Sequence, residues 1–268
     1  MAASKIEQIA RNRFDGWRNR ERFTQLSGDL LPGSMSEAYE AQAELYNLMR
    51  NEAGLSEFAG HKVALTSPAI QEMCGVDQPA YGAIFREFVH ANEHMADPAD
   101  FIRLGIEFEV AFRIGETLAA TDNSYDAETV RPFIESAMPA FELIDDRDAD
   151  YAHLDGMSIL CDRCWCNGIV LGEAVTDIAH LDFSNLRSEV EWNGTVDEEG
   201  NTGWVLENPL NSIAFVANHL IARGQTLNAG EVVMTGSALK TRFPVAGDKA
   251  IYRVDGLGEV VASVATPA

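Results

Sequence analysis

The sequence predicts an α+β fold in which a helical N-terminal region precedes a larger body rich in β-strands. In the first 57 residues, apolar side chains recur with the three- and four-residue spacing of amphipathic helices. From about residue 60 onward, short alternating or apolar runs are separated by glycine, proline and asparagine, a pattern typical of strands and turns. The 268 residues suffice for one or two domains with a substantial core. We therefore expect a helical region over residues 1–57 and a β-rich body over residues 58–268.

Two helices are expected in the N-terminal region. The first has an apolar stripe formed by Ile6, Ala10, Phe14 and Trp17. The second begins at a capping-box pattern, Ser34 to Glu37, and ends near Gly54. Its apolar stripe consists of Ala38, Ala41, Leu45 and Leu48. We interpret both as packing helices that carry no chemistry.

The body begins with short strands and turns. Residues 106–113 alternate strictly between apolar and other side chains and predict a strand, and a helix is expected over about 126–137, ended by Pro139. Further strands are expected at 141–144, 168–171, 190–192, 232–235, 250–254 and 260–264. Asn193-Gly194 directly after a strand predicts a tight hairpin. A last helix over about 212–223 stops at Gly224.

The charge of the chain is unusual. The formal net charge is −22, residues 1–50 are neutral, and residues 107–162 hold 14 acidic residues against three arginines. A surface of this sign repels phosphate backbones and anionic lipids, so we expect neither nucleic-acid nor membrane binding. The acidic residues either form a solvated surface or hold a cation.

Targeting signals and cysteines point to one compartment. No apolar run approaches the ~18–20 residues that span a bilayer, and the N-terminus lacks the apolar core of an export signal. We therefore expect a cytoplasmic protein with reduced thiols. Cys161, Cys164 and Cys166 are interpreted as small buried side chains, because a structural zinc site needs four ligands.

The strand at residues 106–113 carries the most informative pattern. Its apolar residues share one face, so Glu107 and Glu109 point together from the other face. Two carboxylates at such a short distance repel each other unless a cation lies between them. Their hard oxygen atoms are suitable ligands for Mg²⁺, Mn²⁺ or Ca²⁺. A solvated strand face is the alternative. Glu142 strengthens the metal hypothesis, because it lies in another apolar run, where an unpaired carboxylate is costly.

Several runs in one order resemble a known family. They are residues 60–67 (GHKVALTS), 75–82 (GVDQPAYG), 105–109 (GIEFE), 139–145 (PAFELID), 168–172 (GIVLG), 217–220 (ANHL), 222–224 (ARG), 230–237 (GEVVMTGS) and 256–258 (GLG). Together they resemble the 2-keto-4-pentenoate hydratase / 4-oxalocrotonate decarboxylase family of the fumarylacetoacetate hydrolase superfamily. The resemblance implies that residues 58–268 form a catalytic domain, a mixed β-sheet roll of the fumarylacetoacetate hydrolase type.

The resemblance also implies a divalent cation, Mg²⁺ or Mn²⁺, held by Glu107, Glu109 and Glu142. The carboxylate and C2 oxygen of a small anionic 2-oxo or 2-hydroxy-dienoic acid chelate that metal in such enzymes, and the metal stabilises charge on the C2 oxygen. Lys62 matches a lysine beside the metal that binds the acid group or moves protons; a surface lysine is the alternative.

Three further residues complete the expected substrate site. Thr66 and Ser237 lie in matching runs, and for Ser237 plain turn chemistry is an equal alternative. Arg163 stands where the family commonly has asparagine, and we hypothesise that it selects a second substrate carboxylate.

The expected reaction is hydration of 2-hydroxypenta-2,4-dienoate, or of a close analogue, in the breakdown of aromatic compounds. Hydratases of the family often carry an acidic residue where this chain has Ala80, so decarboxylation of a 2-oxo-3-enedioate is the first alternative. An acylpyruvate hydrolase and a non-catalytic metal-binding relative remain as further alternatives. The family further implies a homo-oligomer.

Two other metal patterns are set aside. His90 to His94 fit the H-x-x-E-H zinc pattern, but Pro98 follows closely and no long helix is expected there. Asp146, Asp148 and Asp150 resemble the start of a calcium loop that lacks its glycine and its final glutamate; we interpret them as a solvated loop.

Overall fold

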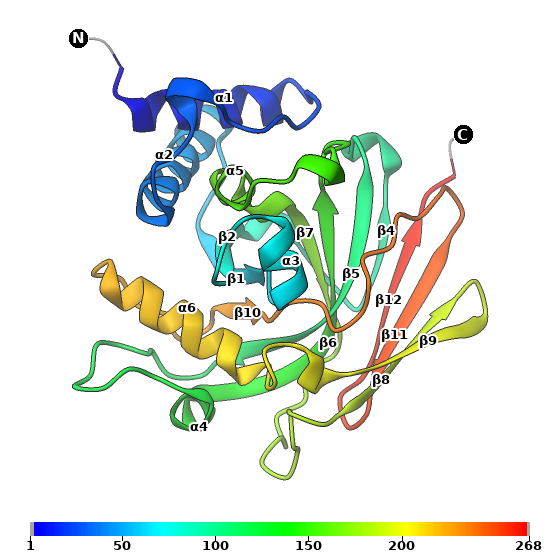
Figure 1. The fold of residues 1–268 in the computed structure, drawn as a ribbon. Coiled ribbons are helices and arrows are strands. Elements are labelled where there is room, and N and C mark those ends of the chain that lie inside the picture. Colours follow the sequence, from blue (N-terminus) through cyan, green and yellow to red (C-terminus); the bar gives the residue numbers. More distant parts are fainter. Residues whose placement is uncertain (1–2, 267–268) are drawn as a thin grey trace.

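The computed structural model describes residues 3–266, which form two β-sheets with helices packed around one of them (Figure 1). The larger sheet has the strand order β2-β1-β10-β5-β6-β7-β3 and the smaller one β4-β12-β11-β8-β9. The strands are β1 (Phe58–Ala64), β2 (Ala80–Phe85), β3 (Val89–Ala91), β4 (Glu93–Ala96), β5 (Leu104–Ile114), β6 (Ile134–Asp145), β7 (Cys166–Leu171), β8 (Arg187–Trp192), β9 (Thr195–Asn201), β10 (Val232–Met234), β11 (Lys249–Val254) and β12 (Gly258–Val264). The α-helices are α1 (Lys5–Arg18), α2 (Met35–Ala53), α3 (Pro68–Met73), α4 (Ala127–Val130), α5 (Gly156–Cys161) and α6 (Leu210–Ala222).

The two expected N-terminal helices are confirmed as α1 and α2. The Ser34 hydroxyl accepts the Glu37 amide at 3.2 Å, which caps α2. The Glu37 carboxylate turns back to the amide of Gly33 rather than to that of Ser34, so only half of the capping box forms. Gly54 ends α2 with φ of 74°, in the left-handed region that favours glycine.

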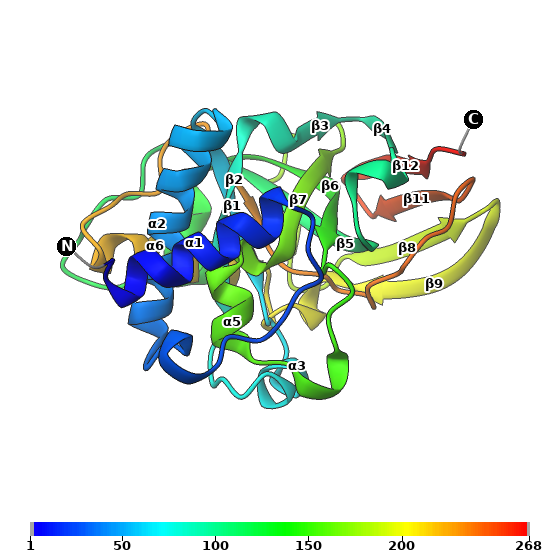
Figure 2. The same ribbon diagram turned by 90° about the horizontal axis from the view of Figure 1, so that it is seen from above.

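Helix α2 is tied to the larger sheet by three side chains. The Tyr39 hydroxyl accepts the amide of Tyr81 and the Tyr46 hydroxyl accepts that of Ala83, both on strand β2. The Gln42 amide group donates to the Tyr81 carbonyl. Figure 2 shows α1 and α2 crossing over this side of the sheet. The boundary expected at residue 57 falls between α2 and β1, and the division into two domains stays a prediction.

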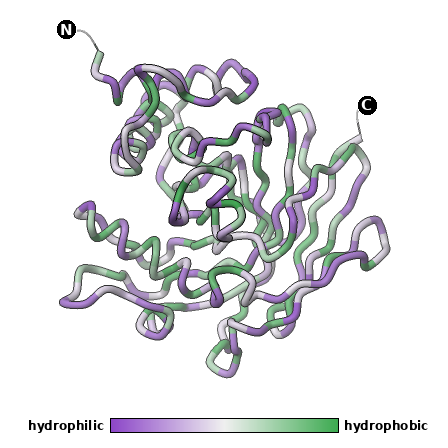
Figure 3. The backbone as a smooth tube through the Cα atoms, viewed as in Figure 1, coloured by the Kyte–Doolittle hydropathy of each residue, from purple (hydrophilic) through white to green (hydrophobic). Residues whose placement is uncertain are grey.

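Strands β5 and β6 form the long antiparallel centre of the larger sheet. On the face toward the smaller sheet, Phe108, Phe141 and Tyr252 are fully buried and their ring centroids lie 5.7–6.2 Å apart. Such aromatic pairs contribute about 0.5–1.5 kcal/mol each beyond the burial of their area. Figure 3 shows hydrophobic stretches where the sheets meet and hydrophilic ones in many outer turns. The apolar faces of β5 and β6 therefore hold the two sheets together and leave their other faces for the site.

One predicted element is wrong. The helix expected over 126–137 is a single turn, α4, followed by a 3₁₀ turn over Arg131–Phe133, and Pro139 lies inside β6. Strand β6 pairs with β5 along nearly its whole length, and this long-range pairing outweighs the local helical pattern. Pro139 is tolerated inside β6. Its carbonyl accepts a hydrogen bond from the amide of Gly172, and the N–H group that proline lacks removes only one hydrogen bond from the strand pairing.

The other expected elements are confirmed. The six further runs correspond to β6, β7, β8, β10, β11 and β12, although β10 ends at Met234, one residue before the predicted end. Asn193 and Gly194 join β8 to β9 with φ of 51° and 82°, the positive pair that a tight type I′ hairpin requires. The last helix is α6, followed by Gly224 with φ of 71°. None of the helices within residues 3–266 has the length and apolar character to cross a membrane.

Candidate metal centre and substrate cavity

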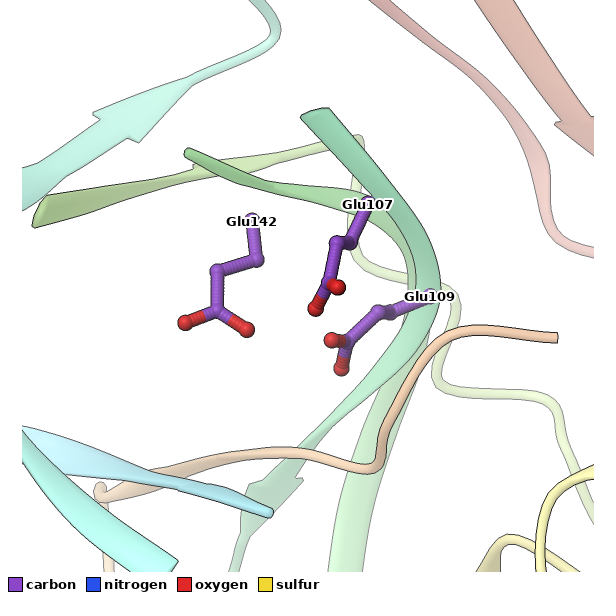
Figure 4. Close-up of side chains that lie close together, drawn as sticks. All are labelled: Glu107, Glu109 and Glu142. Atoms are coloured by element: carbon purple, nitrogen blue, oxygen red, sulfur yellow. The ribbon is translucent and has the colours of Figure 1, made fainter. Parts of the chain in front are cut away.

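Glu107, Glu109 and Glu142 converge on one point (Figure 4). Glu107 lies directly opposite Glu142 in the β5–β6 ladder, and Glu109 follows two residues later on the same face. One carboxylate oxygen of each residue lies within 4.8 Å of the other two. The register of two paired strands therefore assembles the triad that the sequence predicts.

The carboxylate oxygens of the triad have few hydrogen-bond partners. Glu109 and Glu142 are fully buried, whereas Glu107 is partly exposed. The amide of Gly236 donates to Glu109 Oε2 at 2.7 Å, and the Thr241 hydroxyl donates to Glu107 Oε1 at 2.6 Å. Within the described residues, Glu109 Oε1 and Glu142 Oε2 have no hydrogen-bond partner, and Glu142 Oε1 faces Lys62. Such buried carboxylate oxygens fit the hard ligand set of Mg²⁺ or Mn²⁺.

The electrostatics of the triad support a cation. Burial, together with the charges of Glu142 and Glu107, raises the pKa of Glu109 well above its usual value. Burial is also the main cause that raises the pKa of Glu142 to about 7, with Glu107 adding to it and Lys62 opposing it. Ionised carboxylates in this position destabilise the fold unless a cation neutralises them.

Lys62 is buried beside the triad. Its side chain is 2% exposed, and Nζ lies 3.1 Å from Glu142 Oε1 and donates to the Cys164 carbonyl at 3.0 Å. Burial is the largest single influence on the pKa of Lys62 and lowers it, but the charges of Glu142, Cys164 and Glu107 together outweigh burial and raise the pKa above its ordinary value. The surface-lysine alternative is thus excluded, and Lys62 is an ammonium group at the site.

A left-handed turn presents the Cys164 carbonyl to Lys62. Arg163, Cys164 and Trp165 have φ of 59°, 50° and 63°, a conformation that costs energy for residues other than glycine. The preceding residue, Asp162, is held by Arg147 in a buried ion pair of 2.5 Å. Because Arg147 lies two residues after the end of β6, this pair links the turn to the strand that carries Glu142.

Glu107 connects the triad to a cavity of about 600 Å³, which Glu109 and Glu142 do not line. Lys62, Gly236, Thr66 and Ser237 also line this cavity. The Ser237 hydroxyl accepts the amide of Phe108 at 2.9 Å and donates to the Leu239 carbonyl at 2.8 Å. These bonds favour the turn alternative for Ser237.

Thr66 and Gly236 are in close contact in the lining of this cavity. A Cβ at Gly236 would lie 2.5 Å from Thr66 Cγ2, and Gly236 has φ of 102°. Glycine is therefore required where this loop donates its amide to Glu109.

Arg163 is not brought to the cavity, which corrects the expectation that it binds substrate. Its guanidinium lies over the rings of Trp17 and Phe88, at 5.6 and 5.9 Å from their centroids. Arg163 is buried there and does not line the cavity. The left-handed turn is the physical reason, because it directs the Cys164 carbonyl to Lys62 and the Arg163 side chain toward α1.

Several cavity residues were missed from the sequence. Lys240 and Thr241 lie three and four residues after the 230–237 run, so their closeness to that motif was an available signal. Tyr151, which directly follows the Asp146 to Asp150 pattern, and Trp204 also line the cavity, but neither belongs to a run that carries the resemblance.

The alternative metal patterns are resolved by geometry. His90 and His94 lie on β3 and β4 rather than on a helix, and their rings stack with centroids 3.6 Å apart. Within residues 3–266 the glutamate triad is the one cluster of three or more metal-binding groups. All four cysteines are free and buried, as expected for the three near β7. The expected solvated loop is wrong for Asp146, which is fully buried and paired with Arg103.

The fold and the site together define a family. The model of the fumarylacetoacetate hydrolase C-terminal region matches residues 71–265, and the chain belongs to this family. It is 30% identical over 237 residues to a 2-keto-4-pentenoate hydratase of Burkholderia vietnamiensis (strain G4 / LMG 22486), covering 88% of each chain. It is 32% identical over 241 residues to a 4-oxalocrotonate decarboxylase of Pseudomonas sp. (strain CF600), covering 85% of each. These relatives confirm the predicted resemblance and the prediction of an enzyme.

A solved structure agrees over nearly the whole chain. The 4-oxalocrotonate decarboxylase of Pseudomonas putida G7, complexed with magnesium and adipate, superimposes with a TM-score of 0.88 at 27% identity and covers 98% of both chains. This match confirms the predicted α+β fold of the fumarylacetoacetate hydrolase type. It also supports magnesium as the cofactor, because this relative is complexed with that ion and the glutamate triad here can bind a metal.

Proposed function

We propose that the protein is a divalent-metal-dependent lyase that hydrates 2-hydroxypenta-2,4-dienoate, or a close analogue, to a 4-hydroxy-2-oxo acid in the breakdown of aromatic compounds. The observation that carries this proposal is the set of three clustered carboxylates, two of them fully buried, with a buried lysine beside them at a cavity whose lining is mainly apolar. Chains named as 2-keto-4-pentenoate hydratases are among the relatives.

The residues divide the chemistry between them. Glu107, Glu109 and Glu142 would hold Mg²⁺ or Mn²⁺, which supplies a Lewis acid for the acid group and C2 oxygen of the substrate. Lys62 is protonated, so it can bind the substrate carboxylate or donate the proton that turns the dienol into the 2-oxo-3-enoate. The Cys164 carbonyl holds Nζ in place for either role. Conjugation of the resulting enoate with its 2-oxo group makes C4 electrophilic toward water.

Decarboxylation of a 2-oxo-3-enedioate is the second candidate, and one observation favours it. Apart from Glu107, Glu198 is the one carboxylate that lines the cavity within the described residues, and it is paired with Arg242 at 2.8 Å. No imidazole lines the cavity there either. Loss of CO₂ needs no base to activate water, because the electron pair of the broken bond passes into the 2-oxo acid as an enolate. Acylpyruvate hydrolysis needs such a base and is not supported.

One assay tests the proposal. The purified enzyme with Mg²⁺ is offered 2-hydroxypenta-2,4-dienoate and 2-oxohex-3-enedioate separately, and ultraviolet absorbance and released CO₂ are followed. We expect Mg²⁺-dependent loss of the dienoate, with CO₂ formed only if the second candidate is correct. The double variant Glu107→Gln/Glu109→Gln should be inactive on both. Turnover that survives in this variant would refute the proposed role of the triad.

The cytoplasmic location and the homo-oligomeric state expected from the sequence stay predictions.

A further inference from the structure

The cavity has two chemically different parts. Lys62, which is buried beside the triad, and Glu107, which belongs to the triad, line the cavity. Much of the remaining lining is apolar and includes Leu65, Ile70, Met73, Leu154, Ile159 and Trp204, of which Ile70, Met73 and Trp204 are exposed and therefore lie toward its opening. A volume of about 600 Å³ falls within the range of sites for drug-sized ligands. A five-carbon hydroxy acid is much smaller than such ligands and leaves the apolar part unfilled.

Exposed apolar side chains gather at this cavity. Nine large hydrophobic side chains are exposed in the part of the chain that the structure describes, and four of them line the cavity. These four are Ile70 (39% exposed), Met73 (41%), Tyr151 (39%) and Trp204 (62%). They come from α3, from the 3₁₀ turn Tyr151–His153 and from the 3₁₀ turn Thr202–Trp204. Contiguous exposed apolar surface of this kind marks a binding site.

The charges of the outer part favour an apolar occupant. Glu198 and Lys240 are its charged lining residues, and Glu198 is engaged by Arg242. Lys240 is exposed, so its ammonium remains hydrated. A carboxylate placed against the apolar side chains of the outer part would lose part of its hydration without a buried partner, whereas an alkyl or aryl group would bury surface that is otherwise exposed to water.

We propose that Ile70, Met73, Tyr151 and Trp204 form a subsite for an apolar substituent at the far end of the substrate. The preferred substrate is then a 2-hydroxy-dienoate that carries an alkyl or aryl group, rather than the unsubstituted five-carbon acid or a dicarboxylic acid. This inference rests on the proposed function, because it places the acid end of the substrate at the triad and Lys62.

Binding of unreactive 2-oxo acids tests the subsite without turnover. Pyruvate, 2-oxohexanoate, 4-phenyl-2-oxobutanoate and 2-oxoadipate are titrated calorimetrically into the Mg²⁺-loaded enzyme. We expect the affinity to rise about three- to fourfold for each added methylene group. We expect 2-oxoadipate to bind at least about tenfold more weakly than 2-oxohexanoate, because its second carboxylate enters the apolar part.

Variants test which residues produce the gain in affinity for apolar substituents. Trp204→Ala and Met73→Ala should each reduce the gain in affinity from pyruvate to 4-phenyl-2-oxobutanoate, and Trp204→Phe should restore most of it. Val245→Ala is the matched control, because Val245 is exposed but does not line the cavity, and it should leave the gain unchanged.

Each other outcome overturns the inference in a recognisable way. Equal affinities along the series would show that the apolar part binds no substituent. Tighter binding of 2-oxoadipate, lost in Lys240→Met, would make the outer part an anion subsite. A change of oligomeric state in Trp204→Ala with an unchanged affinity gain would make the rim a subunit contact. If no 2-oxo acid binds in a Mg²⁺-dependent way, the proposed function fails and the inference falls with it.

Discussion

Three carboxylates share one site but differ in their surroundings. Glu107 is partly exposed and accepts a hydrogen bond from Thr241, Glu109 accepts one from the Gly236 amide, and Glu142 is paired with Lys62 alone in the described part of the chain. Burial raises the pKa of both Glu109 and Glu142, so without a cation their negative charge works against folding at neutral pH. Glu109 and Glu142 are therefore expected to destabilise the metal-free protein, and a bound cation would offset this cost.

The variant Glu109→Gln should separate these two effects. In a chelator at pH 8 we expect its free energy of unfolding to exceed that of the wild type by about 1–2 kcal/mol, because a repelling buried charge is lost while the Gly236 amide keeps an acceptor. At a Mg²⁺ concentration about 100 times the dissociation constant, the free energy of unfolding of the wild type should increase by about 2.7 kcal/mol. That of the variant should hardly change. Urea unfolding with and without Mg²⁺ measures both. Glu135→Gln, an exposed position on the same strand as Glu142, is the control, and a less stable metal-free Glu109→Gln would contradict the argument.

Replacing Lys62 should remove turnover but not the metal. In Lys62→Met we expect kcat to fall about 10²–10⁴-fold, because the positioned proton donor is lost. Mg²⁺ affinity should be kept or increased, since Glu142 is then no longer shared with an ammonium group at 3.1 Å. Steady-state kinetics and Mn²⁺ titration followed by electron paramagnetic resonance give the two values. Lys249→Met, at an exposed lysine on β11, should change neither, and an equal loss of metal affinity and rate in Lys62→Met would instead make Lys62 a structural partner of the triad.

At the scale of the element, strand β1 places two buried basic residues side by side. Lys62 joins the triad, while the His61 ring lies against Tyr81 and Phe58 with centroids 5.9 and 6.4 Å apart. His61 Nε2 is 3.9 Å from Glu231 Oε2, too far for a hydrogen bond, and Nδ1 has no partner within the described residues. Burial therefore dominates and lowers the pKa of His61 to about 4.

This histidine should make the protein sensitive to acid. Above pH ~6.5 His61 is neutral in both the folded and the unfolded chain, and its contribution to stability is fully present. As the pH falls from 6.5 toward 4, only the unfolded chain takes up a proton on His61. The free energy of unfolding therefore decreases by up to about 3 kcal/mol. Urea unfolding at pH 7, 6 and 5 should show a smaller loss in His61→Gln than in the wild type. The exposed His153→Gln is the control, and parallel pH profiles for wild type and His61→Gln would rule this cause out.

Sequence patterns predicted helix ends and tight turns correctly where contacts between neighbouring residues determine the structure. The cap at Ser34, the positive φ at Gly54 and the Asn193-Gly194 turn depend on a few neighbouring residues, and all three appear as expected. The expected helix over 126–137 fails because β6 pairs with β5 across a separation that no local pattern reveals. Element boundaries set by distant partners are thus the part of the fold that the sequence alone could not predict.

At the scale of the whole molecule, the site depends on contacts between distant segments. Lys62 comes from β1, the triad from β5 and β6, and the Cys164 carbonyl from the turn before β7. The resemblance predicted which residues meet. It could not predict that Lys62 is bound by a backbone carbonyl, or that Arg163 packs against Trp17, because the backbone conformation of one turn decides both.

The net charge of −22 should slow the approach of the substrate. An anionic substrate reaches the cavity against a repulsive field, and the screening length shortens from about 30 Å at 0.01 M salt to about 8 Å at 0.15 M. With Mg²⁺ kept saturating, we therefore expect kcat/KM to rise severalfold over this salt range, while kcat changes little. The rise should be larger for 2-oxohex-3-enedioate, a dianion, than for 2-hydroxypenta-2,4-dienoate, a monoanion. Sucrose at matched viscosity is the control for diffusion alone. If kcat/KM falls with salt for both substrates, the local cations Lys62 and Lys240 and the bound metal dominate the approach, and the overall charge of the protein does not act on this reaction.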